Sequence, residues 1–411
     1  LIGYVDDDTK KHGKIIHQVP VLGATMELAQ LCRDHSIDEV IIAIPSAKGD
    51  TIREIFKNCE THDIKYKITP GLSDIIDGKI TMSQLREVRI EDLLGRDVID
   101  VDIHEMSAYL SGAAILITGA GGSIGSELCR QIQRFSPKRM ILLDLSENNM
   151  YHIHMEMNNI PQSQSEIIPV VLDVKNKARL EELIQKYTPT VVFHAAAHKH
   201  VPMMEANVRE VVENNVVGTQ NLLKLSAKYN VENFVLISTD KAVNPTNCMG
   251  ATKRICEIML QIEATNNPKT KFSAVRFGNV LGSMGSVVPL FKRQIAAGGP
   301  VTVTHPDMTR FFMTIPEAVS LVIQTGALSG GGEIFILDMG ESVKIIDLAR
   351  DLIRLSGLEE GRDIDIQIVG LRPGEKLYEE LFYDKKHLKK TTIRKIFVTE
   401  PTEFGADTAE Q

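Results

Sequence analysis

The feature that most constrains the fold of this 411-residue chain is the stretch TGAGGSIGSELCRQI, which follows an apolar run and opens an amphipathic helical pattern. Its glycines Gly119, Gly122 and Gly125 are spaced as in a dinucleotide-binding loop. The first glycine permits a tight turn, the second lets backbone amides approach a pyrophosphate, and the third lets the helix pack closely on the strand. The phosphates would lie at the positive N-terminus of that helix. The loop therefore predicts a bound dinucleotide.

A carboxylate at the end of the next apolar run indicates which dinucleotide binds. Asp144 follows the loop by about twenty residues, where a carboxylate can hold a ribose 2′-hydroxyl and repel a 2′-phosphate. The sequence therefore favours NAD over NADP, and Asp173, at the end of the third run, would lie near the adenine ring. A glycine-rich structural turn is the alternative, but it does not account for the strand, the helix and Asp144 together.

Apolar runs alternate with helical stretches from Ala113 onward. Six strands separated by helices predict an α/β fold with a doubly wound parallel (Rossmann) sheet. After Gly282 the pattern becomes mixed, which predicts a small mixed substrate-binding subdomain. The predicted strands are 115–118, 140–144, 167–173, 191–195, 234–238 and 272–277.

A smaller domain precedes this one. The β-branched run EVIIAIP (39–45) lies between two helical patterns, which predicts a partial Rossmann-like α/β domain with a small parallel sheet. The chain opens at Leu1 in a strand-like run, so we expect that this domain lacks its first part. The predicted boundaries are 1–100 for this domain, 101–112 for a linker, 113–395 for the catalytic domain (an NAD-binding core to about 280, then the substrate subdomain 281–395) and 396–411 for a tail.

Composition excludes several classes of protein. The apolar content of 43% and charged content of 24% are typical of a soluble globular protein, and the net charge of −8 argues against a nucleic-acid surface. Five scattered cysteines without a CxxC pair indicate a reducing, cytoplasmic compartment. No run has the continuous apolar length of a membrane helix.

The chemistry is indicated by ISTDKAVNPTNCMGATKR (237–254). In one large class of nicotinamide enzymes, the residue four before a lysine such as Lys253 is a tyrosine that moves a proton. Here that residue is Met249, whose thioether cannot do so. Asp240 and Lys241, at the end of the fifth predicted strand, offer an acid and a base instead. An Asp-Lys turn after a strand is the alternative, and the preceding dinucleotide loop favours the catalytic interpretation.

Seven segments carry a resemblance to a known family: TGAGGSIG, AAAHKHVPMME, NNVVGTQN, STDKAVNPTNCMGATKR, VRFGNVLGSMGSVVPLF, TRFFMTIPEAV and LRPGEKLYEEL. They span most of 113–382 and resemble the extended short-chain dehydrogenases/reductases. Within that superfamily, the chain is most similar to the large, membrane-associated UDP-N-acetylglucosamine 4,6-dehydratases of bacterial glycan pathways. In that subgroup the tyrosine is replaced by methionine, and the first domain resembles the one that precedes the catalytic domain.

The resemblance implies a reaction in which NAD+ oxidises the C4 hydroxyl of the sugar, water leaves across C5–C6, and hydride returns to C6. It implies that Lys241 is the base at C5, that Asp240 is the acid at C6, and that Thr239 bonds the C4 hydroxyl. The proton of the C4 hydroxyl would leave through Asp240 or an ordered water. Lys253 would hold the nicotinamide ribose, and Met249 would face the sugar from the same side of the helix.

The remaining site residues are expected around a bound NAD+ and a bound UDP-sugar. Arg310 and Arg372 are guanidinium groups that can bind phosphate bidentately. Beyond the residues already named, the expected cofactor contacts are Ser123, Ile124, Val174, Ala195, Ala196 and Ala197, and the expected substrate contacts are His198, Lys199, Asn279, Val287, Lys292, Thr302 and Glu375.

Other readings stay open at this stage. His194, His198, His200 and Glu205 have no clean ligand spacing, so no metal site is expected. A nucleotide-sugar 4-epimerase shares the fold and the first oxidation, and a non-enzymatic NAD-binding sensor is a further alternative. Resemblance to the large subgroup implies retention of the C5 configuration. We also expect a homo-oligomer, and a full-length protein held at the cytoplasmic face of the inner membrane by an upstream segment.

Overall fold

The computed structural model describes residues 1–44, 49–62, 64–69, 88–94, 103–160, 165–383 and 388–399. The chain divides into two compact units. The smaller unit comprises residues 1–99 together with 349–365, and the larger comprises 100–348 together with 366–411.

The larger unit is organised around one sheet, with strand order β18-β19-β15-β11-β10-β9-β6-β7-β8. The strands from β8 to β15 are parallel, whereas β19 and β18 are antiparallel additions at one edge. The six strands predicted from apolar runs are confirmed, and three strands from the C-terminal part join them. Their bounds are β6 (Ala114–Thr118), β7 (Arg139–Asp144), β8 (Glu166–Val171), β9 (Val191–His194), β10 (Asn233–Ile237), β11 (Lys271–Arg276), β15 (Glu333–Leu337), β18 (Leu388–Lys390) and β19 (Ile396–Thr399).

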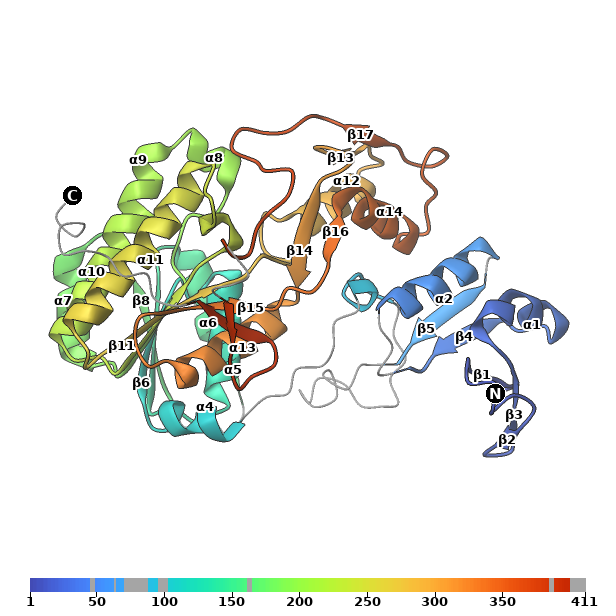
Figure 1. Ribbon diagram of the computed structural model, residues 1–411, viewed down its shortest axis with the longest axis horizontal. Helices are drawn as coiled ribbons and strands as arrows, with labels where there is room; N and C mark the ends of the chain where they lie inside the picture. Colours follow the sequence, from blue (N-terminus) through green and yellow to red (C-terminus); the bar gives the residue numbers. More distant parts are fainter. Residues whose placement is uncertain are drawn as a thin grey trace. The chain divides into compact units, whose positions relative to one another are not determined.

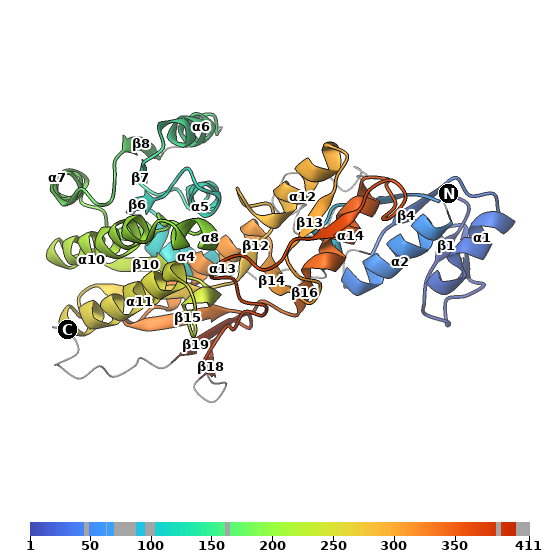
Figure 2. The same cartoon turned by 90° about the horizontal axis from the view of Figure 1, so that it is seen from above.

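Helices cover both faces of this sheet, as a doubly wound fold requires (Figure 1). On one face α13 packs against α4 and α5, and on the other α10 packs against α7 and α11 (Figure 2). Helix α4 lies within the predicted linker 101–112. The bounds are α4 (Ile103–Leu110), α5 (Ser123–Gln133), α6 (Glu147–Asn158), α7 (Lys177–Tyr187), α8 (Val201–Glu205), α9 (Val208–Val211), the π-helical η3 (Val212–Val217), α10 (Gly218–Lys228), α11 (Cys248–Asn266) and α13 (Ile315–Leu328).

The core of this unit lies where α7, α10 and α11 cover the sheet. Side chains such as Leu116, Val192, Phe234 and Phe272 are fully buried there. Burial of each large apolar side chain stabilises the fold by about 1.5–3 kcal/mol. Because strands β6 to β11 and β15 are parallel, their carboxyl ends lie along one edge of the sheet. The loops that follow these strands come together at that edge.

Shorter elements follow the core, in agreement with the mixed pattern after Gly282. Strand β12 pairs parallel with β14, which pairs antiparallel with β16, and β13 pairs with β17. The bounds are η4 (Asp240–Ala242), β12 (Asn279–Val280), α12 (Val287–Ala296), β13 (Val301–Val303), β14 (Thr309–Met313), β16 (Ser342–Lys344), α14 (Ile345–Leu355) and β17 (Ile366–Ile368).

The smaller unit contains the predicted βαβ element. Strands β4 and β5 are parallel and α2 connects them, while β3 lies between β1 and β2 in a second small sheet. The predicted boundary between the first domain and the linker, at residues 100 and 101, lies outside the described residues. The bounds are β1 (Tyr4–Val5), β2 (Ile15–Ile16), β3 (Val19–Gly23), η1 (Thr25–Glu27), α1 (Leu28–Asp34), β4 (Glu39–Ile42), α2 (Gly49–Thr61), β5 (Lys65–Ile68) and η2 (Asp92–Leu94).

Candidate active site

The glycine-rich loop forms a tight turn between β6 and α5. Gly119 has a φ of +66°, and a Cβ added to it would lie 2.7 Å from the backbone nitrogen of Ala196. Gly122 is the N-cap of α5, and a Cβ on Gly125 would overlap the carbonyl oxygen of Gly119. A side chain at either Gly119 or Gly125 would therefore force the backbone apart. Helix α5 begins with Ser123 and Ile124, and the N-terminus of a helix can bind an anion.

Asp144 lies beside this loop, at the end of β7. Its Oδ2 accepts a hydrogen bond from the backbone N–H of Gly121 at 2.9 Å, and its Oδ1 accepts one from Ser146 at 2.8 Å. These two bonds fix the plane of the carboxylate against the loop. The position is the one that a ribose-binding carboxylate requires in this fold.

The loops after β8 and β9 run past the same edge of the sheet. Asp173 accepts from the backbone of Lys175 at 2.9 Å, and Val174 is buried. Ala195 donates its N–H to the carbonyl of Thr118 at 3.1 Å. The chain 195–197 therefore passes directly beside the first glycine of the dinucleotide loop.

Asn215 holds the segment after β9 in place at His198. It lies in the π-helical segment η3, and its side chain exchanges hydrogen bonds with the backbone of His198 at 2.8 and 3.0 Å. It also donates to the hydroxyl of Thr252 on α11 at 3.1 Å. The π-helical turn therefore orients the Asn215 amide so that it links the loop after β9 to α11. Single π-helical turns are often found at functional sites. His198 also contacts Glu210 at 3.1 Å.

Lys253 is a buried cation on α11. It is 5% exposed, and burial lowers the pKa of its ammonium group. Its Nζ makes no hydrogen bond to the part of the chain that the structure describes. A buried ammonium without a hydrogen-bond acceptor is unfavourable in the free protein, and a ribose hydroxyl would satisfy it. Together with the glycine cradle and Asp144, this group fits a bound NAD+.

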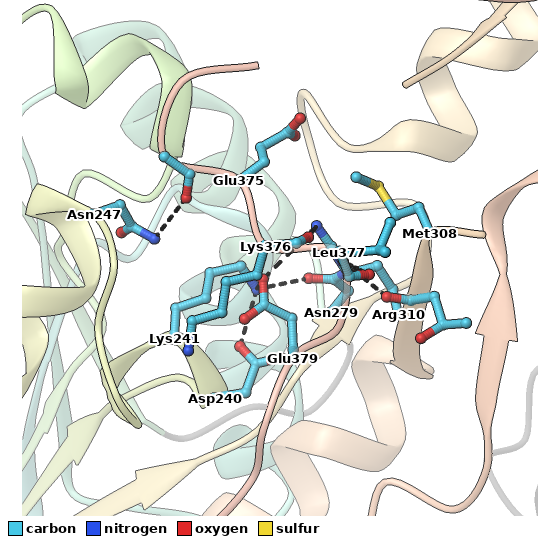
Figure 3. Close-up of polar contacts among 12 residues, drawn as sticks. Asp240, Lys241, Asn247, Asn279, Met308, Arg310, Glu375, Lys376, Leu377 and Glu379 are labelled. Atoms are coloured by element: carbon cyan, nitrogen blue, oxygen red, sulfur yellow. Dashed lines mark hydrogen bonds and ion pairs between the residues drawn. The ribbon is translucent and has the colours of Figure 1, made fainter. Parts of the chain in front are cut away.

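The predicted acid and base, Asp240 and Lys241, lie together at the carboxyl end of β10 (Figure 3). Lys241 donates from Nζ to Oδ1 of Asp240 at 2.9 Å, and Thr239 donates from its hydroxyl to the same oxygen at 2.8 Å. Lys241 also donates to the side-chain oxygen of Asn279 at 3.3 Å. Four of the predicted site residues are thus within one hydrogen-bonded group.

The second oxygen of Asp240 is different from the first. Oδ2 is buried and has no hydrogen-bond partner among the described residues. A Cβ on Gly278 would lie 3.2 Å from it, so the absence of a side chain at Gly278 leaves space beside this buried oxygen. An unpaired buried oxygen is costly, so this atom can accept one further hydrogen bond.

Met249 is buried in an apolar cluster. It is 3% exposed and packs with Val201, Met204 and Val211. The thioether thus extends the apolar packing between α8, α9 and α11 and brings no polar atom to the site. Met249 itself therefore offers no group for proton transfer.

A buried glutamate, Glu379, joins this group, and the sequence analysis did not select it. Its side chain is 3% exposed, and its Oε1 lies 3.8 Å from both the Lys241 Nζ and the Arg310 Nη2. Burial raises the pKa of Glu379, and the charge of Asp240 adds to this rise, whereas Lys241 and Arg310 oppose it. The only sequence signal is a pair of glutamates in KLYEEL, which any solvated segment could carry.

The segment 374–383, which we call the strap, crosses the loop that follows η4. Asn247 donates to the carbonyl of Gly374 at 3.1 Å, Lys376 donates to that of Val243 at 3.1 Å, and Tyr383 donates to that of Ala242 at 3.1 Å. These bonds hold the strap against the catalytic loop and place Glu379 beside Lys241.

Arg310 anchors the strap from the other side. It is 7% exposed, and its guanidinium donates to the carbonyls of Lys376, Leu377 and Thr309 at 2.7, 3.1 and 2.8 Å (Figure 3). Binding of a diphosphate by Arg310 remains a prediction, and these contacts give the residue a structural task in the free protein.

The other expected substrate contacts do not join this group. Arg372 is exposed and pairs with Glu375 at 2.6 Å. Thr302 on β13 accepts from Gln294 of α12 at 2.7 Å. The remaining three are Lys199 and Lys292, both exposed, and Val287, the first residue of α12.

The environment of His194 indicates a structural role. It is fully buried and bonds Thr118 at 2.7 Å through Nδ1 and Thr219 at 2.9 Å through Nε2. Burial lowers its pKa to about 3, so the ring is neutral at ordinary pH. Within the described ranges, no group of three or more His, Cys, Asp or Glu side chains could hold a metal ion.

A doubly wound parallel sheet, a glycine-rich loop at the N-terminus of α5 and a buried lysine on α11 define an extended short-chain dehydrogenase/reductase fold. Comparison of sequences gives the family. The sequence model of the polysaccharide biosynthesis protein family matches residues 115–401, and the chain belongs to this family. A second model, that of a CoA-binding domain, matches residues 1–70.

Three curated relatives place the chain more closely. It is similar to capsular polysaccharide biosynthesis protein CapD of Staphylococcus aureus, with 50% identity over 95% of this chain, and it spans 65% of that protein's length. The uncharacterized membrane protein MJ1061 of Methanocaldococcus jannaschii is 47% identical over 74% of this chain and 90% of its own length. A UDP-N-acetylglucosamine 4,6-dehydratase (inverting) of Campylobacter jejuni is 36% identical over 68% of this chain and 80% of its own length.

Solved structures agree on the fold. Pen from Bacillus thuringiensis has a TM-score of 0.66 and 32% identity, covering 71% of this chain and 90% of Pen. The dTDP-glucose 4,6-dehydratase DesIV from Streptomyces venezuelae, solved with NAD, has a TM-score of 0.57 and covers 65% of this chain and 88% of its own. Its identity is 21%, so it supports the fold alone. None of the helices in the described ranges is long and apolar enough to span a bilayer.

Proposed function

We propose that this chain carries the catalytic part of a UDP-N-acetylglucosamine 4,6-dehydratase. The observation that carries the proposal is the bonded pair of Asp240 and Lys241 at the carboxyl end of β10, with Lys253 behind it. Elimination of water needs an acid and a base together, which oxidation alone does not. Because Met249 has no proton to give, the pair also has to serve the oxidation step.

The cofactor in this proposal is NAD+, which accepts hydride from C4 of the sugar and returns it to C6, so that it is regenerated at each turnover. The cradle at Gly119 and Gly122, the carboxylate of Asp144 and the unpaired Lys253 support it. Further contacts to the cofactor are proposed at Ser123, Ile124, Gly125, Asp173, Val174 and the chain 195–197.

Lys241 acts as the base at C5 and Asp240 as the acid at C6. For the elimination, the Lys241 amine takes the C5 proton while Asp240 gives a proton to the departing C6 hydroxyl. The unpaired Oδ2 of Asp240 supports this assignment, because it is the oxygen that protein groups leave free. Lys241 then returns its proton to C5 after hydride has reached C6.

Thr239 connects the C4 hydroxyl to Asp240. Its hydroxyl donates to Oδ1 of Asp240 at 2.8 Å. We propose that the C4 hydroxyl passes its proton to the Thr239 oxygen while the Thr239 proton moves to Asp240. The carboxyl group of Asp240 thus gains one proton in the oxidation step and gives one proton to the C6 hydroxyl in the elimination step, so the two steps balance without a tyrosine.

The substrate in this proposal is a UDP-sugar. The dehydratase from Campylobacter jejuni, whose name includes UDP-N-acetylglucosamine, supports this choice at 36% identity. The exposed guanidinium of Arg372 is the group best suited to a diphosphate. The other proposed contacts are His198, Lys199, Asn279, Val287, Lys292, Thr302, Arg310 and Glu375.

We propose that the C5 configuration is retained. A single base, Lys241, removes the C5 proton and returns it from the same face of the sugar. The relative with 36% identity is named an inverting enzyme, so the stereochemistry separates this chain from that relative. Incorporation of deuterium at C5 followed by analysis of ring couplings measures it.

The experiment that tests the function is incubation of the purified chain with UDP-N-acetylglucosamine or UDP-glucose, without added cofactor, followed by mass spectrometry. Loss of one water from UDP-N-acetylglucosamine, together with NAD+ released on denaturation, is the expected result. An unchanged mass with a new retention time would indicate a 4-epimerase. Rapidly exchanging NAD+ without any turnover would indicate a sensor.

Assembly of the full-length protein is part of the proposal. Membrane association is supported by the relative whose name describes a membrane protein. Self-association is supported by the exposed apolar side chains Val208, Val212, Val217 and Ile255 on α9, η3 and α11. Light scattering on the purified chain measures the second point, and a monomer at all concentrations would contradict it.

A further inference from the structure

Glu379 is a carboxyl group beside Lys241 that the proposed reaction does not use. Its side chain is almost fully buried, and its Oε2 has no hydrogen-bond partner among the described residues. Oε1 lies 3.8 Å from the ammonium of Lys241, an ion-pair distance that is longer than a hydrogen bond. A buried carboxylate with an unpaired oxygen is unfavourable, and protonation would relieve it.

The charged groups around Glu379 come from three elements. Asp240 and Lys241 lie on η4, Arg310 lies on β14, and Lys376 lies on the strap itself. Burial is the largest influence and raises the pKa of the Glu379 carboxyl. Asp240 acts in the same direction, and the three cations act against it. Burial and the charge of Asp240 therefore favour the protonated form of Glu379 more than solvent would.

The proposed reaction requires a group that accepts one proton from the Lys241 ammonium. Lys241 can take the C5 proton only as a neutral amine, and Asp240 can take the C4 proton only as a carboxylate. The ion pair in the structure, with Lys241 charged, holds one proton too many for this state. Its destination must lie within reach of Lys241 and must not be Asp240.

We propose that Glu379 is a positioning residue that accepts this proton and keeps Lys241 neutral for catalysis. The inference rests on the proposed function. In this step Lys241 Nζ and Glu379 Oε1 first approach from 3.8 Å to hydrogen-bond distance. The N–H bond of the ammonium then breaks, its electron pair stays on nitrogen, and the proton forms an O–H bond with Oε1. Lys241 is then free to take the C5 proton, and it is neutral again after returning it.

A merely structural role for Glu379 predicts different behaviour. As an anchor of the strap beside Arg310, it would affect the shape of the site at every pH. As a proton acceptor, it affects the site only where Lys241 would otherwise be charged. The pH dependence of kcat therefore separates the two roles, provided that KM is measured beside it.

The test is Glu379→Gln, an isosteric change that removes the accepting carboxylate, assayed on the whole chain with UDP-N-acetylglucosamine from about pH 6 to about pH 10. We expect kcat to fall about 100-fold near neutral pH, with KM within about threefold of the original value. The loss should shrink as pH rises, because Lys241 can then release its proton to water. Glu263→Gln is the matched control, since burial also raises the pKa of Glu263 and it lies at the far end of α11.

A loss of kcat that is constant across pH, or unchanged kcat, would overturn the inference while leaving the dehydratase activity intact. An original protein that does not convert the substrate would end the proposed function, and the inference with it. Should Glu379→Gln fail to fold, Glu379→Asp takes its place. That variant keeps a carboxyl group and should keep the original pH dependence, so a dependence that rises with pH would contradict the proposal.

Discussion

Lys241 donates a 2.9 Å hydrogen bond to one oxygen of Asp240, and the other oxygen of that carboxylate is buried without a hydrogen-bond partner in the described part of the chain. The two oxygens of this carboxylate thus differ, because one is satisfied by protein groups and the other is buried and can still accept a hydrogen bond. Proton transfer at a site without a tyrosine depends on this asymmetry.

Replacing Asp240 with asparagine should remove the acid while keeping its shape. We expect kcat to fall by about 10²- to 10⁴-fold, because general acid catalysis at C6 is lost. Binding of NAD+ should not change, since Asp240 is not among the proposed cofactor contacts. Formation of the 4-keto product measures activity, Asp307→Asn on an exposed loop is the control, and a fully active Asp240→Asn would exclude Asp240 as the acid.

The space beside Asp240 should matter as much as the carboxylate. In Gly278→Ala the added methyl would lie 3.2 Å from Oδ2 of Asp240 and 3.1 Å from Cβ of Phe311. We expect a destabilisation of about 1–3 kcal/mol from overpacking, and at least about a tenfold loss of kcat if the methyl occupies the place of the C6 hydroxyl. Thermal unfolding and turnover measure the two effects.

Gly330→Ala is the matched control for that change. Gly330 lies outside the site, and a Cβ there would lie 2.9 Å from the carboxylate of Glu333. A Gly278→Ala protein with normal kcat would show that substrate does not approach Oδ2 from this side.

Lys253→Met should stabilise the cofactor-free protein and weaken its binding of NAD+. Removing a buried ammonium that has no hydrogen-bond acceptor among the described residues should raise the free energy of unfolding of the cofactor-free chain, by about 1–3 kcal/mol. Affinity for NAD+ should fall about tenfold or more, because a charge-assisted bond to ribose is lost. Calorimetry measures both, with Lys269→Met on the surface as the control. Unchanged NAD+ affinity would contradict the ribose contact.

We predict that His194 contributes to the loss of folding stability at low pH. Its pKa is lowered by burial from 6.5 to about 3, so below pH 6.5 the unfolded chain binds a proton that the folded chain does not. Stability should therefore fall as pH decreases from about 6.5 toward 3, by on the order of a few kcal/mol.

His194→Gln keeps a donor and an acceptor but does not titrate. Denaturant unfolding of this variant should depend less on pH between about 6 and 4 than unfolding of the original chain. The exposed His152→Gln should show the original dependence. An equally steep pH dependence in His194→Gln would assign the acid sensitivity to other groups.

The sequence was sufficient to predict the large sheet and the positions of the dinucleotide loop. Strand periodicity and the glycine spacing are local signals, and the apolar runs at 115–118 and 234–238 became β6 and β10. Thr239, Asp240 and Lys241 could be selected because they follow a strand directly, and parallel strands present their carboxyl ends at one edge.

Glu379 could not be selected in the same way. It lies 138 residues after Lys241 in the sequence, and no local pattern joins the two. Its burial results from the carbonyl contacts of Arg310 and from the bonds that hold the strap to the loop after η4. The long-range packing that brings β15 and β19 into the main sheet was likewise absent from the local pattern, which is mixed after Gly282.

The central claim is that this chain removes water from a UDP-sugar through Asp240 and Lys241. The most direct measurement is proton NMR of UDP-N-acetylglucosamine incubated with the purified chain in D2O, with no added cofactor. We predict a C6 methyl signal, deuterium at C5, and ring couplings that show the retained configuration. The appearance of UDP-N-acetylgalactosamine, or an unchanged spectrum even with NAD+ supplied, would contradict the claim.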